Sequence, residues 1–226
     1  MKLSILMPVY NEVKTLSGII DLILFMDLDK ELIIADDGSN DGTRELLEQK
    51  YKGKPGINII FHEQNLGKGA AIQTTLKHAI GDYAIIQDAD MEYNPHDYRI
   101  MLDIVKREAA EVVFGSRFAK TWRSTSFLHY LVNWFLTTVF NILFGTSLTD
   151  METCYKMIRT DIFKDLGIKA KHFEIEPEIS AKLIKRGLKI REVGISYQGR
   201  GYHEGKKITW KDGLYTLWSI FKYRLM

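Results

Sequence analysis

The segment Ala84-Ile85-Ile86-Gln87-Asp88-Ala89-Asp90-Met91-Glu92 joins an apolar run to three acidic residues at alternating positions. The apolar run indicates a buried strand. In an extended chain alternate side chains point the same way, so the carboxylates of Asp88, Asp90 and Glu92 would converge beyond the strand end. Carboxylates that close repel one another unless a cation lies between them, and a divalent metal ion with oxygen ligands is the simplest candidate. The alternative is a solvated acidic turn, because Asp is also common in turns.

The flanking sequence places this strand in an α/β sheet. Strands are expected at 3–9, 32–35, 57–61 and 83–87, separated by helices over about 13–26, around 46–47 and over about 65–80. This alternation with short connections predicts a mostly parallel sheet with helices on both faces. Ligands bind beyond the carboxyl ends of the strands in such sheets. Tyr10, Asp37 and Asp88 all fall at such ends, which favours a functional role for the acids.

The second half of the chain is less regular. A helix is expected over 96–107, strands near 111–117, 153–158 and 188–195, and a helix over 174–185. No linker rich in Pro, Ser or Gly divides the chain. We therefore expect a single domain over residues 1–226.

Bulk composition excludes several classes of protein. The chain has 226 residues, of which 46% are apolar and 27% charged, as in ordinary folded domains. A formal net charge of +2, without a basic stripe interleaved with aromatic residues, argues against nucleic-acid binding. Cys154 is the only cysteine, which excludes an internal disulfide and fits a reducing compartment. The apolar run at residues 1–8 is too short for a secretory signal and is expected to be the first strand.

Five motifs then occur in a characteristic order: Pro8-Val9-Tyr10-Asn11-Glu12, Asp36-Asp37-Gly38-Ser39-Asn40-Asp41-Gly42-Thr43, Asn65-Leu66-Gly67-Lys68-Gly69, Asp88-Ala89-Asp90 and Gly115-Ser116-Arg117. Together they resemble the family 2 glycosyltransferases of GT-A fold, particularly the branch of dolichyl-phosphate mannosyltransferase and bacterial polyprenyl-phosphate glycosyltransferases. The resemblance covers nearly the whole chain. It implies a Rossmann-like sheet in which residues 1–115 bind a nucleotide sugar and residues 116–226 form the acceptor side.

The resemblance also implies a donor site. Asp88, Asp90 and Glu92 would match the acids around a diphosphate bound to Mg²⁺ or Mn²⁺, although the lipid-phosphate branch often has Gln where Glu92 stands. The nucleotide-sugar pocket would match Pro8, Tyr10, Glu12, Ala35, Asp37 and Ala89. Lys68 could neutralise phosphate, and a solvated lysine at a helix start is the alternative.

Near the C-terminus, Arg200-Gly201-Tyr202-His203-Glu204-Gly205-Lys206-Lys207 resembles a mobile family loop whose cations reach phosphates. The family's serine is missing from this loop, so the resemblance does not decide which of Lys206 and Lys207 would reach a phosphate. Breaking the sugar C1–O bond leaves new negative charge on a nucleoside diphosphate. A metal ion held by Asp90 and its neighbours would offset that charge, as would Arg200 and Lys206.

The segment Phe127–Phe144 is the most apolar part of the chain and has no Lys, Arg, Asp or Glu. Every fourth position carries a polar residue, which forms one stripe: His129, Asn133, Thr137 and Asn141. A membrane-spanning helix would have to bury that stripe against other spans, and this chain offers none. Two interpretations stay open, a core helix and an interfacial helix whose stripe faces the site. The flanking Lys120, Trp122 and Arg123, with the amphipathic segment 214–226, favour the interfacial helix.

The acceptor is either a lipid phosphate or a hydroxyl compound. A phosphate monoester has a second pKa of about 6, so it needs cations rather than a base. The candidates are Arg117, Arg123 and His129, although the family often has Arg near the place of His129. A hydroxyl would need a carboxylate base, for which the candidates are Asp150, Glu152, Glu174 and Glu176. Glu174 and Glu176 could equally stabilise a helix N-terminus, and Asp150 could be a turn residue; the position of Asp150 after the apolar helix, where the family often has an acid, favours a site role.

We therefore expect an inverting, metal-dependent glycosyltransferase with Asp90, Asp150 and Arg200 as its catalytic residues. It would move a hexose from a GDP- or UDP-sugar to a polyprenyl phosphate, as a peripheral protein at the cytoplasmic face of a membrane. The first competing hypothesis keeps the donor and uses a saccharide or other hydroxyl acceptor. Two more are a nucleotidyltransferase, which would release pyrophosphate, and a nucleotide-binding regulator without catalysis.

Overall fold

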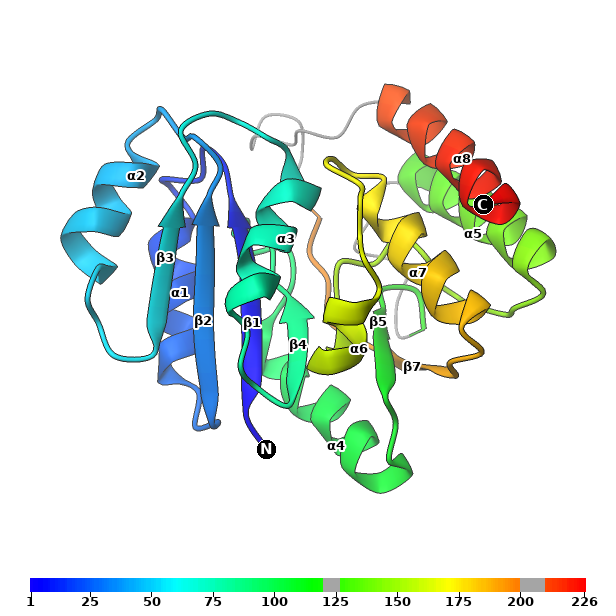
Figure 1. Ribbon diagram of the computed structural model, residues 1–226, viewed down its shortest axis with the longest axis horizontal. Coiled ribbons are helices and arrows are strands. Elements are labelled where there is room, and N and C mark those ends of the chain that lie inside the picture. Colours follow the sequence, from blue (N-terminus) through cyan, green and yellow to red (C-terminus); the bar gives the residue numbers. More distant parts are fainter. Residues whose placement is uncertain (120–126, 200–209) are drawn as a thin grey trace.

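A seven-stranded sheet forms the centre of the molecule, in the order β3-β2-β1-β4-β6-β5-β7 (Figure 1). The computed structural model describes residues 1–119, 127–199 and 210–226, with side chains described in 1–119, 130–199 and 213–226. The strands are β1 (Leu3–Val9), β2 (Lys30–Asp36), β3 (Ile57–Phe61), β4 (Tyr83–Ile86), β5 (Val112–Ser116), β6 (Lys156–Arg159) and β7 (Ile190–Gly194). All neighbouring pairs are parallel except the two that involve β6. The predicted mostly parallel α/β sheet is confirmed.

Helices cover the sheet and extend beyond its β7 side. The helices are α1 (Leu16–Phe25), α2 (Thr43–Leu46), α3 (Lys68–His78), α4 (Tyr98–Glu108), α5 (Phe127–Phe144), α6 (Thr160–Asp165), α7 (Ile175–Lys185) and α8 (Trp210–Leu225). A π-helical turn, Leu47–Tyr51, continues α2, and a 3₁₀ turn, Pro95–Asp97, precedes α4. In Figure 1, α3 lies in front of the sheet and α1 behind it, as predicted, while α5 and α8 lie side by side at the edge.

The apolar runs that predicted the first strands form the core. Ile5, Leu6 and Met7 of β1 have no exposed surface, and the same holds for Ile85 and Ile86 of β4. Burial on both faces explains why these strands are continuously apolar rather than alternating. The carboxyl ends of β1, β2 and β4 therefore lie at one edge, where the predicted ligand site was placed.

The strand expected at 153–158 begins later, at Lys156, and runs antiparallel between β4 and β5. Residues 151–155 instead form turns and bends, through which the chain returns from α5 to the sheet. An apolar pattern carries no information on strand direction, so the sequence could not predict this insertion. It brings Met151–Tyr155 beside the end of β4, where the Cys154 Sγ lies 3.8 Å from the Ile86 carbonyl oxygen.

Buried hydrogen bonds fix the end of β4. The Gln87 side-chain oxygen accepts hydrogen bonds from the Tyr155 hydroxyl, at 2.6 Å, and from the Tyr98 hydroxyl. All three side chains are fully buried. Because a buried amide without partners costs free energy, this arrangement holds the chain firmly as it enters the acidic segment.

Candidate active site

The loop after β2 is organised by Asp37, which is only 2% exposed. Its carboxylate accepts hydrogen bonds from the backbone amides of Leu66 and Gly67, at 2.9 and 2.8 Å, and contacts His62 Nδ1 at 2.7 Å. Asp37 therefore joins the second motif to the third. Sequence analysis expected Asp37 to contact the nucleotide, but in this conformation its carboxylate serves the protein's own loop.

The ends of β1 and β2 interlock through short loops. The amide of Asn11, a residue with φ of 52°, donates to Ser39 Oγ at 2.9 Å, and the Glu12 amide donates to Thr43 Oγ1 at 2.9 Å. Pro8 and Tyr10 are half-buried beside these loops. Ala35 has no exposed surface, so the expectation that it touches a ligand is not met in this conformation. The structure thus brings the predicted donor-side motifs together, while burying Ala35 beneath them.

The acidic segment after β4 does not continue as an extended strand. The chain turns at residues 89–90, and Met91 has a left-handed φ of 63°. The expected extended geometry is therefore wrong at residues 89–91, and alternation, which applies only to extended backbone, no longer supports convergence of the three carboxylates. The Asp90 Oδ1 accepts a hydrogen bond from the Glu92 amide at 3.2 Å, and the Glu92 Oε2 accepts one from the Tyr197 hydroxyl at 2.6 Å.

Asp88 points instead toward a lysine from the third motif. The Lys68 ammonium lies 3.0 Å from Asp88 and 3.4 Å from Glu176 Oε1, and its side chain is 14% exposed. Burial alone lowers the pKa of the Lys68 ammonium, but the charges of Asp88 and Glu176 outweigh it and hold the pKa well above its ordinary value. Lys68 is therefore an ion-paired cation and not the solvated lysine that sequence analysis kept as its alternative.

Two glycines allow Lys68 to reach this position. A Cβ at Gly67, whose φ is 97°, would meet the Lys171 carbonyl oxygen at 2.4 Å, and one at Gly69 would meet the Ala170 carbonyl oxygen at 2.3 Å. Only residues without a side chain let the start of α3 approach the segment before α7 so closely. This approach places Glu176, in the first turn of α7, next to Lys68.

Lys156 continues the same network into the core. Its ammonium, with no exposed surface, donates hydrogen bonds to Glu176 Oε2, to the Met151 carbonyl at 3.0 Å and to the Thr153 carbonyl. Positive and negative groups thus alternate from Lys156 through Glu176 and Lys68 to Asp88. Sequence analysis missed Lys156, although a lysine inside an expected buried strand is a signal of such a role. It also missed Tyr197, which nothing in the local pattern distinguishes.

On the other side of the acidic segment, Arg117 and Asp150 form a buried pair. The Arg117 Nε and Nη2 donate to the two Asp150 oxygens at 2.7 and 2.8 Å, and the Arg117 amide donates to Oδ2 at 3.0 Å. The Asp150 side chain has no exposed surface. An acid held this firmly is poorly suited to the catalytic role expected of it, and the pair instead fixes the exit of β5.

The polar stripe of α5 faces this pair. Asn133 Oδ1 accepts from Arg117 Nη2 at 3.3 Å, Thr137 Oγ1 accepts from the Met151 amide at 3.2 Å, and Asn141 exchanges two hydrogen bonds with the Leu148 backbone. The stripe thus anchors the segment 148–151 from behind. Asn133, Thr137 and Asn141 therefore face the protein, and the interfacial placement of the helix stays a prediction.

Glu152 differs from the other predicted acids. Its Oε1 is buried and, like Glu176 Oε1, has no hydrogen-bond partner within the described ranges, but only Glu176 Oε1 has a recorded ion pair, 3.4 Å from the Lys68 ammonium. Burial raises the pKa of the Glu152 carboxyl to about 7; Glu176 and Asp150 add to the rise, whereas Lys156 and Arg117 oppose it. Glu174, the remaining candidate base, accepts a hydrogen bond from the Lys171 amide at 3.2 Å just before α7. Arg123, His129, Arg200, Lys206 and Lys207 lie outside the residues whose side chains are described.

The residues present suit a divalent cation that arrives with a phosphate ligand. Within residues 1–119, 127–199 and 210–226, no three His, Cys, Asp or Glu side chains are placed to hold a metal ion by themselves. Mg²⁺ is commonly bound by one or two carboxylates together with substrate phosphates, so Asp88 and Asp90 would be sufficient protein ligands. The described site also has twice as many acids as cations: Asp88, Asp90, Glu92, Asp150, Glu152 and Glu176 against Lys68, Arg117 and Lys156.

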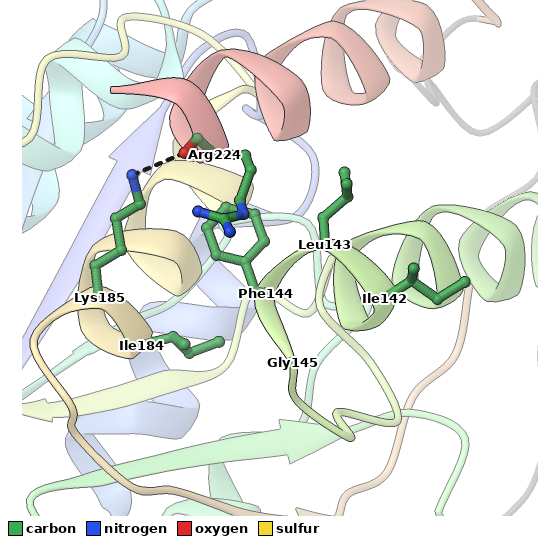
Figure 2. Close-up of a pocket in the computed structure, with 7 residues that line it drawn as sticks. All are labelled: Ile142, Leu143, Phe144, Gly145, Ile184, Lys185 and Arg224. Atoms are coloured by element: carbon green, nitrogen blue, oxygen red, sulfur yellow. Dashed lines mark hydrogen bonds between the residues drawn. The ribbon is translucent and has the colours of Figure 1, made fainter.

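Two pockets differ in their relation to this site. One, of about 500 Å³, is lined by His62, Glu63, Gln64 and Leu66 and so adjoins the Asp37 loop. The other, of about 430 Å³, lies between the C-terminal parts of α5, α7 and α8 (Figure 2). Figure 2 shows Lys185 reaching across it, where its ammonium donates a hydrogen bond to the Arg224 carbonyl at 3.1 Å. Of the predicted site residues with described side chains, none lines this second pocket.

Comparison with known proteins agrees with this geometry. The family model described as "Glycosyl transferase family 2" matches residues 4–167. The chain is 30% identical over 198 residues to Glycosyltransferase AglJ of Haloferax volcanii, covering 87% of this chain and 63% of that protein. It is 24% identical over 212 residues to dodecaprenyl-phosphate galacturonate synthase of Rhizobium johnstonii, covering 91% and 62%. The chain thus spans about three fifths of the length of these two relatives.

A similar architecture occurs in a solved structure. Glucosyl-3-phosphoglycerate synthase of Mycobacterium tuberculosis, in complex with Mn²⁺, UDP and glucosyl-3-phosphoglycerate, matches with a TM-score of 0.72 and 17% identity. The match covers 100% of this chain and 80% of that one. This likeness shows the fold, and the GT-A fold implied by the sequence motifs is confirmed.

Proposed function

The chain belongs to glycosyl transferase family 2, and from this membership we propose that it transfers a hexose from a nucleotide sugar to a polyprenyl phosphate. The transfer would invert the configuration at the sugar C1 and would occur at a membrane surface. The Rhizobium johnstonii relative, named a dodecaprenyl-phosphate galacturonate synthase, supports a lipid-phosphate acceptor. Other solved structures of the Mycobacterium tuberculosis enzyme, one with Mn²⁺ and UDP-glucose and one with Mg²⁺ and UDP, support a nucleotide-sugar donor and a divalent cation.

One observation carries the proposal. Lys68, Asp88 and Glu176 come from three elements and meet at the carboxyl ends of the parallel strands, through contacts of 3.0 and 3.4 Å. Acids for a cation and an ammonium for a phosphate are what a nucleotide diphosphate requires at one place. The adjoining pocket beside the Asp37 loop offers space for the nucleoside.

The protein's own residues would act mainly by binding and positioning. Asp88 and Asp90 would hold Mg²⁺ or Mn²⁺, which when bound supplies positive charge for the leaving diphosphate. Lys68 would contact a phosphate oxygen from the α3 side. Arg117, already held by Asp150, would face the acceptor phosphate with its remaining N–H donors, since a bidentate pair uses only part of the guanidinium. Arg123, His129, Arg200 and Lys206 would add cations, as the sequence predicts.

An exposed apolar face supports membrane contact. Eleven of the sixteen exposed large apolar side chains among the described residues belong to α5, α8 or the residue after α8. We name this set the α5–α8 face: Leu131, Val132, Trp134, Phe135, Ile142, Leu214, Tyr215, Trp218, Phe221, Leu225 and Met226. Such an apolar surface, with Trp and Tyr among its side chains, suits the interface of a bilayer.

Cations lie at the edge of the α5–α8 face. Lys185 and Arg224 border the pocket of Figure 2, and Lys222 lies on α8 itself, which complements an anionic lipid surface. No helix within the described ranges has both the length and the apolar character needed to cross a bilayer. We therefore propose a peripheral contact, at the inner face of a membrane, that brings the acceptor phosphate to the site.

A hydroxyl acceptor is the second candidate, because Glu152 is an acid with a pKa of about 7 and thus suited to act as a base. A panel of nucleotide-sugar donors distinguishes a lipid-phosphate acceptor from a hydroxyl acceptor. UDP- and GDP-hexoses would be incubated with Mn²⁺, with and without polyprenyl phosphate, while nucleoside diphosphate release and radiolabel transfer are followed. The proposal expects label in the lipid phase. Label that appears only in water-soluble saccharide would reject the lipid acceptor, and release of pyrophosphate from a nucleoside triphosphate would reject glycosyl transfer itself.

A further inference from the structure

The segment between α5 and β6 holds Glu152 in a fixed place. The buried Lys156 ammonium donates hydrogen bonds to the carbonyls of Met151 and Thr153, the residues on either side of Glu152. The amide of Met151 donates to Thr137 Oγ1 on α5 at 3.2 Å. With the backbone held on both sides, the fold fixes the place from which the Glu152 side chain projects.

The neighbouring acids are all engaged in strong interactions. Asp150 uses both oxygens for Arg117, and Glu176 uses Oε2 for Lys156 and lies 3.4 Å from Lys68. Glu192 accepts hydrogen bonds from Thr149 and from the Asp150 amide. Glu152 Oε1 has no hydrogen-bond donor in the described part of the chain; Glu176 Oε1 also lacks one, but it lies 3.4 Å from the Lys68 ammonium. A buried carboxyl oxygen without a donor costs free energy, which a ligand group could recover.

Glu152 also lies between the two halves of the site. The charged groups around it are Arg117 at the exit of β5, Asp150 in its own segment, Lys156 on β6 and Glu176 on α7. Arg117 belongs to the acceptor side of the proposed site, and Glu176 is linked through Lys68 to Asp88 on the donor side. A phosphate that approaches Arg117 while facing the donor would therefore come close to the Glu152 carboxyl.

We propose that Glu152 contacts the acceptor phosphate and shares one proton with it. The inference rests on the proposed lipid-phosphate acceptor, and it assigns a proton-carrying residue that neither the motifs nor the comparisons assign. A carboxylate in this place would repel a phosphate dianion, whereas a protonated carboxyl donates a hydrogen bond to it. The phosphate and the carboxyl can share one proton, because the second pKa of a phosphate monoester and the pKa of a carboxyl at this place are close to each other.

The chemistry balances with no further reactant. A monoanionic acceptor phosphate gives its proton to the Glu152 carboxylate, which becomes a neutral carboxyl. The resulting dianion forms a bond from its oxygen to the sugar C1, while the bond from C1 to the diphosphate oxygen breaks and its electron pair leaves with the nucleoside diphosphate. The product is a phosphodiester with one negative charge. Glu152 then releases its proton to solvent when the product departs.

The test is the pH dependence of kcat/KM for polyprenyl phosphate in wild type and in Glu152→Gln. Wild type should rise as the phosphate ionises near pH 6 and fall above about pH 7, as Glu152 loses its proton. Gln keeps an N–H donor and cannot ionise. The variant should therefore lack the alkaline fall, so its activity relative to wild type should increase up to about tenfold for each pH unit above that point.

Matched variants make the result specific. Glu48→Gln removes a half-exposed acid of the π-helical turn, paired with Lys52 at 4.0 Å, and it should reproduce the wild-type profile. Glu152→Ala lacks the donor and should raise KM for the acceptor below about pH 7, where wild type keeps its proton. Superposable profiles of Glu152→Gln and wild type would overturn the inference while leaving the proposed function intact. So would loss of the folded variant's activity at every pH, which a base for a hydroxyl acceptor would produce. Failure of wild type itself to label the lipid would instead reject the proposed function.

Discussion

The Lys68 ammonium lies 3.0 Å from the Asp88 carboxylate, so a lysine from the start of α3 neutralises an acid from the end of β4. This contact links the glycine-containing third motif to the acidic fourth motif through their side chains. The ammonium holds a position that a divalent cation bound to Asp88 would compete for. Donor binding would resolve that competition if Lys68 exchanged Asp88 for a phosphate oxygen.

Replacing Lys68 with Met should therefore have opposite effects on two ligands. Affinity for Mn²⁺ alone should increase, by roughly tenfold, because Asp88 is released from its ion pair. Affinity for the nucleotide sugar should decrease by a similar factor, because the phosphate loses a charge-assisted hydrogen bond. Calorimetric titration of each ligand measures both, and Lys77→Met, an exposed lysine of the same helix, is the control. Weaker Mn²⁺ binding in Lys68→Met would contradict this view of the pair.

The Arg117–Asp150 pair should stabilise the fold more than it serves chemistry. Asp150→Asn leaves the Arg117 guanidinium, whose side chain is 10% exposed, without its countercharge. The free energy of unfolding should fall by about 3 to 5 kcal/mol, as measured in urea.

The comparison that isolates burial is Asp165→Asn, which breaks an exposed pair with Arg186. Its effect should be about 0.5 kcal/mol or less. The double variant Arg117→Met with Asp150→Leu should recover part of the loss, since no charge is then left buried alone. An Asp150→Asn protein with wild-type stability and no activity would instead restore Asp150 as a catalytic acid.

Sequence patterns predicted the parallel strands and their ligand-binding edge because buried apolar runs and turn residues are local signals. The left-handed turn at Met91 is not such a signal, so the acidic segment was expected to be extended. The role of Asp37 depends on a loop that lies 29 and 30 residues further along the chain. The direction of β6 and the burial of Lys156 likewise follow from tertiary packing, which alternation of residue types does not encode.

The pKa of Glu152 predicts a pH-dependent stability. Its folded-state pKa of about 7 exceeds the ordinary value of 4.5, so the folded protein binds the proton more tightly than the unfolded chain. The stability that this proton contributes is fully present below pH 4.5 and is lost as pH rises through about 7. Because the residue is half-buried, the loss should be about 1 to 2 kcal/mol.

Urea unfolding at a series of pH values measures this loss. Glu152→Gln has no such proton, so its stability relative to wild type should increase between about pH 5 and pH 7.5. Glu48→Gln supplies the same change of charge at an exposed position and should run parallel to wild type. A constant difference between Glu152→Gln and wild type would show that the carboxyl titrates normally.

The α5–α8 face should determine binding to lipid vesicles. Trp218, on α8, is 60% exposed, and Trp218→Ser should weaken sedimentation with anionic vesicles by about tenfold, because burial of a large aromatic side chain is lost. Phe25→Ser, at the end of α1, removes an apolar side chain that is 87% exposed but lies outside this face. It should bind vesicles like wild type. Equal binding by all three proteins would argue that another surface meets the membrane.

Binding of a nucleoside diphosphate, measured by calorimetry with and without Mn²⁺, tests the central claim most directly. The claim is that the acids after β4 and a divalent cation together hold the donor's diphosphate. Wild type should bind UDP or GDP at least about tenfold more tightly when Mn²⁺ is present, and Asp90→Asn should lose that gain while remaining folded. Metal-independent binding in wild type, or an undiminished Mn²⁺ effect in Asp90→Asn, would contradict it.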